Sequence, residues 1–162
     1  MKITAVHVET LELRMDEPFV IASSALAASP CDLVRVETDE GLVGFGEACP
    51  AYEFTGDTLR TVQDVIGEYL GPAVIGKDPF QLEAIVHCWD HELWTVGNQS
   101  ACAALEMALW DLQGKALGRP LCDLIGGRTR DGLVEVIAWG SPAAFSRRSR
   151  SAPLRRRRES AS

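Results

Sequence analysis

Long apolar runs are missing from this chain of 162 residues. A membrane-spanning helix requires about 18 consecutive apolar residues, and no segment approaches that length. The N-terminal segment carries Glu9 and Glu12, where a secretory signal would need an unbroken apolar stretch. We therefore expect a cytoplasmic protein with no membrane partner.

Paired cysteine motifs are missing as well. The five cysteines are odd in number, and none belongs to a CxxC pair, so neither a disulfide framework nor a zinc ribbon is predicted. We interpret most of them as small buried thiols. They are Cys31, Cys49, Cys88, Cys102 and Cys122.

Basic residues are scarce in most of the chain. Residues 1–140 hold 9 Lys and Arg but 22 Asp and Glu, a net charge of −13, whereas residues 141–162 hold seven Arg and one acid, a net charge of +6. The acidic body argues against binding a phosphate backbone, which needs a basic face. Because Phe145 is the only aromatic residue of the basic tail, we expect salt-sensitive adhesion there and not specific nucleic-acid binding.

What remains is the composition of a globular domain, with 46% hydrophobic and 24% charged residues and a mean hydropathy near zero. Apolar and polar residues alternate over residues 2–13, 33–38 and 42–48, which predicts three strands. A turn is expected at residues 39–41, where Gly41 can take a positive φ at no steric cost. The first 48 residues are therefore predicted to form an antiparallel meander.

After the third strand the apolar period changes from two to about 3.6 residues, which predicts helices. The first is expected to begin near residues 55–57 and to stop at the glycine–proline pair 71–72. The second is expected to begin with Asp78 as its cap and Pro79 at the first helical position, and to run through Trp94.

A third helix is predicted from Asn98, as its cap, to a stop at Gly118, and a short helical turn over residues 121–125 follows it. Asp111 and Lys115 lie one turn apart in the acid-first order, which favours an ion pair. The buried stripe of this helix is expected to comprise Ala101, Leu105, Ala108, Leu109, Leu112 and Ala116.

The chain changes character again beyond the helices. Residues 133–138 are apolar and predict a new strand. Residues 141–162 are rich in Arg, Ser and Ala and cannot bury enough surface to offset their ordering entropy, so we predict a disordered tail.

Several segments carry a resemblance to a known family. They are TDEGLVGFGEA at 38–48, TGDT at 55–58, ALEMALWDLQGKALGRPL at 104–121 and the glycine pair at 126–127. In this order and spacing, residues 2–140 resemble the N-terminal capping domain of the enolase superfamily. Within it they are most similar to the mandelate racemase and muconate lactonizing enzyme group.

The resemblance implies an α+β fold, in which a three-stranded antiparallel meander is followed by a helical layer. Only the first strand of the following TIM barrel would be present. The implied division is a capping domain over residues 1–127, the start of a truncated barrel domain over 128–140, and the Arg/Ser-rich tail over 141–162. The chain departs from the family near Ser146; because Arg, Ala, Pro and Ser have GC-rich codons, a shifted reading frame is our hypothesis for the tail.

In members of this family, loops of the capping domain close over the substrate. Carried onto this chain, these loops are residues 17–22 and 50–55. An aromatic loop over a cleft excludes water and shapes specificity; the alternative, that the rings simply pack the capping domain, stays open. The candidate substrate-binding residues are Phe19, Ile21, Tyr52 and Phe54.

The activity implied by the resemblance is that of a magnesium-dependent isomerase, cycloisomerase, epimerase or dehydratase. Such enzymes abstract a proton next to a carboxylate and stabilise the resulting enolate with Mg²⁺. The lysine or histidine bases and the acidic metal ligands of the family lie on barrel strands beyond the first. We therefore assign no catalytic residue and no metal ligand here, and expect no turnover by this chain alone.

Two other groups of residues suggest chemistry but have simpler interpretations. Glu83, His87 and His91 share one side of a predicted helix, which we interpret as a solvated face and not as a metal site. Glu47 is a lone carboxylate at a strand end, which we interpret as structural.

Two further patterns are set aside on spacing. Glu106 and Asp111 diverge by about 140° around their helix, so they are expected to tie it to its neighbours and not to form an acid–base pair. Gly41, Gly44 and Gly46 lie in a hairpin, where their spacing fits neither a dinucleotide fingerprint nor a phosphate-binding loop.

Two functions remain. The first is a capping domain that sets substrate specificity and meets a small carboxylate substrate only together with a barrel domain; residues 55–58 favour the muconate lactonizing or dipeptide epimerase side of the group. The alternative is a non-catalytic binding or regulatory module that docks through the surface normally facing the barrel, or through the basic tail. That surface should be apolar, which favours self-association.

Overall fold

The computed structural model describes residues 1–20, 25–93 and 97–128. Contacts divide the chain into two compact units, of which the first comprises Met1–Arg14 and Ala28–Gly132. In the second, the described residues 15–20 and 25–27 are the outer parts of two strands. The predicted barrel strand at 133–138 and the tail lie outside the described residues. Within the described ranges, no helix is long and apolar enough to cross a membrane.

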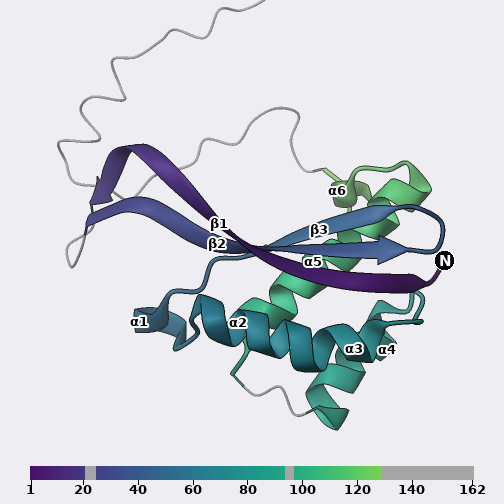
Figure 1. The fold of residues 1–162 in the computed structure, drawn as a ribbon. Coiled ribbons are helices and arrows are strands. Elements are labelled where there is room, and N and C mark those ends of the chain that lie inside the picture. The colour runs from purple at the N-terminus through teal and green to yellow at the C-terminus, as the bar shows by residue number, and fades with distance from the viewer. Residues whose placement is uncertain (21–24, 94–96, 129–162) are drawn as a thin grey trace, which may run out of the picture. The chain divides into compact units, whose positions relative to one another are not determined.

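The sheet confirms the predicted meander. Strands β1 (Ile3–Val20), β2 (Ala25–Thr38) and β3 (Val43–Ala48) lie in the order β1-β2-β3 (Figure 1). β2 and β3 pair antiparallel, from Asp32 opposite Ala48 to Glu37 opposite Val43. The turn between them places Gly41 at a φ of 78°, as predicted.

Both long strands extend well beyond the predicted ranges. β1 reaches Val20, so residues 17–20 belong to a strand and not to a loop after it, which corrects our placement of the first substrate loop. The hydropathy pattern did not predict this extension because apolar and polar residues do not alternate over residues 14–30. The strands are held there by backbone hydrogen bonds between neighbouring strands, which do not depend on such alternation.

The first helical segment continues past its predicted stop. It comprises α1 (Tyr52–Thr55), α2 (Leu59–Val65), the π-helical turn η1 (Ile66–Leu70) and α3 (Gly71–Val74). The prediction that the pair 71–72 ends the helix is therefore wrong. In η1 the N–H of Gly71 bonds to the carbonyl of Ile66, and this wider turn precedes Pro72, where the missing donor would interrupt a regular α-helix.

The second helical segment begins later than predicted. The side chain of Asp78 accepts a hydrogen bond from the N–H of Phe80 at 3.0 Å, so it caps a turn that precedes the helix. Helix α4 (Leu82–His87) and the π-helical turn η2 (Cys88–Glu92) follow. The predicted end at Trp94 lies outside the described residues.

Helix α5 (Gln99–Leu117) matches its prediction in extent, with Asn98 at the N-cap position and Gly118 ending it at a φ of 61°. Five of the six residues expected in its stripe are buried, but Ala116, in the last turn of the helix, is exposed. The short helix α6 (Leu121–Leu124) also forms where predicted.

The core lies between the sheet and the helices, which cover one face of it (Figure 1). Gly44 and Gly46 face α5. A Cβ atom at Gly44 would lie 2.2 Å from the carbonyl oxygen of Ala108, and one at Gly46 would lie 1.9 Å from the carbonyl oxygen of Ala104. Close packing of helix backbone on strand backbone therefore explains these glycines, and agrees with setting aside a phosphate loop. The fully buried side chains include Val34, Val36, Val62, Ile66, Leu70, Ile85, Trp89, Leu105 and Leu109.

Candidate functional site

The second predicted substrate loop folds as one exposed helical turn, α1. The carbonyl of Ala51 accepts from the N–H groups of Phe54 and Thr55 at 2.9 Å, and from the Thr55 hydroxyl at 3.2 Å. Gly56 ends the turn at a φ of 77° and donates its N–H to the carbonyl of Tyr52. These bonds fix the backbone locally without burying any residue of the turn.

The segment after α1 fixes it to the domain. Asp57 is 6% exposed, and its Oδ2 accepts a hydrogen bond from the hydroxyl of Ser100, in α5, at 2.9 Å. Thr58 and Thr61 then form a reciprocal capping box, in which each side chain accepts from the other's backbone N–H. The turn thus sits on a short, anchored connection between β3 and α2.

The two aromatic side chains of this turn face solvent. Tyr52 is 68% exposed and Phe54 is 80% exposed. Neither ring packs into the domain, which argues against the alternative that the two rings fill the domain's own core. The side chain of Phe19 and all of Ile21 lie outside the described residues, so the other pair of candidates stays a prediction.

A polar cluster around the buried Asp32 ties both long strands to α2. Asp32 is fully buried, and its Oδ1 accepts from the hydroxyl of Thr10 at 2.6 Å and from the side-chain amide of Gln63 at 3.0 Å. These residues lie on β2, β1 and α2. Because these hydrogen bonds join three elements and involve no histidine, lysine or cysteine, we interpret the cluster as structural.

The free edge of β3 is covered by side chains of α5. Oδ2 of Asp111 accepts from the N–H of Phe45 at 2.9 Å, and Lys115 donates to the carbonyl of Val43 at 2.7 Å. Asp111 and Lys115 form the predicted ion pair at 2.6 Å, and the ammonium lies 4.8 Å from the centre of the Phe45 ring. The expectation that Asp111 ties its helix to a neighbour is confirmed, whereas Glu106 accepts a hydrogen bond from Trp110 of its own helix at 3.2 Å.

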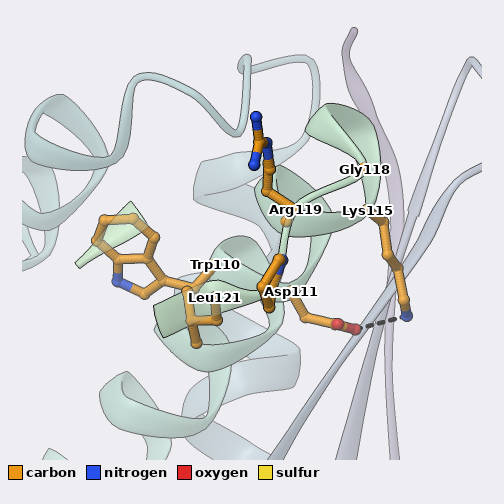
Figure 2. Close-up of a pocket in the computed structure, with 8 residues that line it drawn as sticks. Trp110, Asp111, Lys115, Gly118, Arg119 and Leu121 are labelled. Atoms are coloured by element: carbon orange, nitrogen blue, oxygen red, sulfur yellow. Dashed lines mark hydrogen bonds and ion pairs between the residues drawn. The ribbon is translucent and has the colours of Figure 1, made fainter. Parts of the chain in front are cut away.

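An open pocket of about 360 Å³ lies between the end of α5 and the start of α6. Figure 2 shows Trp110, Arg119 and Leu121 among the residues that line it, and Lys115 turned toward Asp111. Asp123 lies 3.9 Å from Arg119. Because Lys115 and Asp111 already satisfy each other, the pocket suits apolar docking better than acid–base chemistry. The sequence patterns did not predict this pocket, although Trp110 lies about two helical turns before the Gly118-Arg119-Pro120 stop.

The histidines of the second helical segment meet, but they do not complete a metal site. The rings of His87 and His91 lie 4.4 Å apart, centre to centre. Across the described ranges, no group of three or more His, Cys, Asp or Glu side chains could hold a metal ion. The residues of this part of the chain therefore do not fit a Mg²⁺ site, and no step is assigned to the ion here.

Comparison with known proteins shows which family shares this sequence. The sequence profile described as "Mandelate racemase / muconate lactonizing enzyme, N-terminal domain" matches residues 2–126. The N-succinyl-L-Arg/Lys racemase of Bacillus cereus is 37% identical over 128 residues, which cover 79% of this chain and 34% of the racemase. The hydrophobic dipeptide epimerase of Enterococcus faecalis is 35% identical over 136 residues, which cover 84% of this chain and 38% of the epimerase.

Solved structures agree with the sequence relatives. The Bacillus cereus racemase matches with a TM-score of 0.76 at 36% identity, covering 80% of this chain and 35% of the racemase. The 2-chloromuconate cycloisomerase of Rhodococcus opacus matches with a TM-score of 0.80 at 28% identity, covering 92% of this chain and 41% of the cycloisomerase. This chain thus spans little more than a third of its relatives' length. It belongs to the mandelate racemase and muconate lactonizing enzyme family of the enolase superfamily, and matches that family's N-terminal domain.

Proposed function

We propose that this chain is the capping domain of an isomerase of this family, and that the α1 turn forms part of the wall over the substrate. The observation that carries the proposal is the exposure of Tyr52 and Phe54, at 68% and 80%, on a turn whose backbone is fixed. Large apolar side chains gain free energy when they leave water. A closing active site supplies the surface that these two rings lack within their own domain.

The relatives support a proposal for the substrate class. They include a racemase of N-succinyl-Arg and N-succinyl-Lys, a hydrophobic dipeptide epimerase and a chloromuconate cycloisomerase, whose named substrates are all small carboxylates. We propose a small carboxylate for this chain as well. Tyr52 and Phe54 would contact the part of it remote from the carboxylate and exclude water around it.

The proton transfer itself is assigned to a catalytic barrel domain. In this proposal a barrel domain would supply the bases that remove and return the proton next to the carboxylate, and its acidic residues would hold Mg²⁺, which would supply positive charge for the reaction. The capping domain orients the substrate and keeps water out. We expect the chain to work in the cytoplasm and to have no turnover without a barrel.

A chimera tests the capping role. Residues 1–128 replace the matching N-terminal segment of the Bacillus cereus racemase, and turnover is measured with the racemase's own substrate and Mg²⁺. The control is the racemase's catalytic segment expressed without any capping domain. We expect turnover from the chimera well above that of the control. A folded chimera no more active than the control would contradict the proposal.

The pocket beside α6 favours a second candidate, a non-catalytic module that docks to another copy of itself. Leu117, Leu121 and Ile125 are 53%, 39% and 63% exposed near that pocket. Light scattering tests it: a dimer of the wild type that becomes a monomer in Leu121→Asp would support this candidate. A wild-type monomer at high concentration would contradict it.

A further inference from the structure

Hydrogen bonds at the outer edge of β3 show which of its residues direct their backbone N–H and carbonyl groups away from β2. The N–H of Phe45 and the carbonyl of Val43 bond to α5, so the backbone groups of these odd-numbered residues point away from β2. The N–H of Thr38 bonds instead to the carbonyl of Leu42, an even-numbered residue. Odd-numbered residues of β3 therefore form the non-hydrogen-bonded pairs with β2, in which side chains lie closest.

Extended past its last pair, Asp32 opposite Ala48, the same register places two cysteines opposite one another. Arg35 faces Phe45 and Leu33 faces Glu47. One further step of two residues places Cys31 opposite Cys49, again as a non-hydrogen-bonded pair. Such pairs have Cα atoms about 4.5 Å apart, which lies within the span of about 4.4–6.8 Å that a disulfide bridges.

Contacts of the thiols agree with this placement. The Sγ atom of Cys49 lies 3.5 Å from the hydroxyl of Ser29 and 3.9 Å from the carbonyl oxygen of Pro30, the two residues that precede Cys31. Both cysteines are reduced in this structure. Cys31 is 1% exposed, whereas Cys49 is exposed, so a solvent oxidant reaches only one of the two directly.

We propose that Cys31 and Cys49 form a redox pair that closes into a disulfide on exposure to a peroxide. Cys49 gives up its thiol proton, the thiolate attacks hydrogen peroxide, and the O–O bond breaks to leave a sulfenic acid and a hydroxide, which takes up that proton and leaves as the first water. The thiol of Cys31 then attacks this sulfur and loses its proton, and the S–S bond forms as the second water leaves. Two thiols are oxidised, one peroxide is reduced, and a dithiol reductant reverses the reaction.

The environment of the two thiols sets their roles. Burial raises the pKa of the Cys31 thiol, and the charge of the nearby Glu47 carboxylate and a hydrogen bond to it raise this pKa further. Cys31 is therefore a poor thiolate and reacts second. The bond would tie β2 to the residue at which β3 gives way to the connection that carries α1, so the oxidation state would restrict the base of that turn.

Peptide mapping tests the pair directly. Trypsin cleaves after Arg14, Arg35 and Arg60, so Cys31 and Cys49 fall in two peptides, 15–35 and 36–60, that hold one cysteine each. The full chain is treated with a small excess of hydrogen peroxide, alkylated, digested without reductant and analysed by mass spectrometry. We expect these two peptides to be linked about tenfold more than any other cysteine pair, and released by dithiothreitol.

Two variants separate the steps, and a third is the control. In Cys31→Ser, a sulfenic acid should persist on Cys49 and be trapped by dimedone; in Cys49→Ser, Cys31 should stay reduced. Cys122→Ser, in α6, should leave the link between the two peptides unchanged. Cys49 oxidised to a sulfinic acid in the wild type with no link to Cys31, or a link of Cys49 to another cysteine, would overturn the proposal.

Discussion

The backbone N–H of Phe45 donates a hydrogen bond to the carboxylate of Asp111 at 2.9 Å, across 66 positions of sequence. A strand at the edge of a sheet presents unpaired backbone groups that invite pairing with another chain. Asp111 and its ion-pair partner Lys115 occupy these groups on β3. One turn of α5 therefore occupies two of the backbone groups at this edge, the N–H of Phe45 and the carbonyl of Val43.

Removing this carboxylate should cost stability. We expect Asp111→Ala to lower the free energy of unfolding by about 1–2 kcal/mol, because a charge-assisted hydrogen bond is lost and a strand N–H loses its partner. Urea denaturation measures the change. The matched control is Asp64→Ala, which removes only an exposed ion pair with Arg60 and should cost under about 0.5 kcal/mol. Equal losses in the two variants would contradict the edge role of Asp111.

Close packing of α5 on β3 makes a second prediction. A Cβ atom at Gly46 would lie 1.9 Å from the carbonyl oxygen of Ala104, so Gly46→Ala should destabilise the fold by about 2–3 kcal/mol. Gly67, in η1, has open space around it, and Gly67→Ala should be neutral or stabilising by up to about 1 kcal/mol. Denaturation curves compare the two, and a Gly46→Ala variant as stable as Gly67→Ala would refute the packing argument.

Stability should fall in alkaline solution through Cys31. Its pKa is raised in the folded chain by burial, so the unfolded chain releases the proton first. The contribution is complete below the ordinary thiol pKa of about 8.5 and is lost as the pH rises through the higher folded pKa. Unfolding free energies with reductant present should decline less between neutral and alkaline pH in Cys31→Ser than in the wild type.

The control for this pH dependence is Cys122→Ser, which should keep the wild-type slope. The amino group of Met1 also has a raised pKa, through its hydrogen bond to Glu40, and its effect has the same sign in every variant. The effect of the Met1 amino group therefore cancels when the pH dependence of a variant is compared with that of the wild type. Identical slopes for Cys31→Ser and the wild type would show that the thiol does not contribute.

The exposed turn should tolerate truncation of its rings. Tyr52→Ala and Phe54→Ala should each change the free energy of unfolding by less than about 0.5 kcal/mol, since neither ring is buried in the domain. By contrast, Trp89→Ala removes a fully buried ring and should cost about 3–5 kcal/mol. A loss above about 1.5 kcal/mol in the double turn variant would mean that the rings pack the domain.

Sequence patterns predicted those elements whose ends are set by residues close together in the chain. Helix α5 follows from its apolar spacing and its stop at Gly118, and the hairpin turn follows from Gly41. The stop at Pro72 was wrong because a π-helical turn accommodates the proline, and no period-based argument anticipates an inserted residue. The length of β1 was missed because its outer part alternates poorly.

The candidate sites also differ in how far the sequence alone could predict them. Tyr52 and Phe54 could be proposed from the sequence because family motifs flank them, whereas their exposure became visible only in the structure. The pocket beside α6 depends on how two helices meet, which spacing alone does not give. The pairing of Cys31 with Cys49 was within reach once the hairpin turn was placed, but the predicted strands ended short of both cysteines.

The most direct test of the proposal that the α1 turn contacts substrate is the kcat/KM of the chimera that joins residues 1–128 to the catalytic segment of the Bacillus cereus racemase, with either ring of the turn removed. Tyr52→Ala and Phe54→Ala should each lower it by about tenfold, equal to about 1.4 kcal/mol of lost transition-state binding. The control is Tyr69→Ala, which removes a ring of similar exposure, 59%, from η1 and should leave kcat/KM unchanged. Wild-type kcat/KM in both turn variants would contradict the claim that this turn forms the substrate wall.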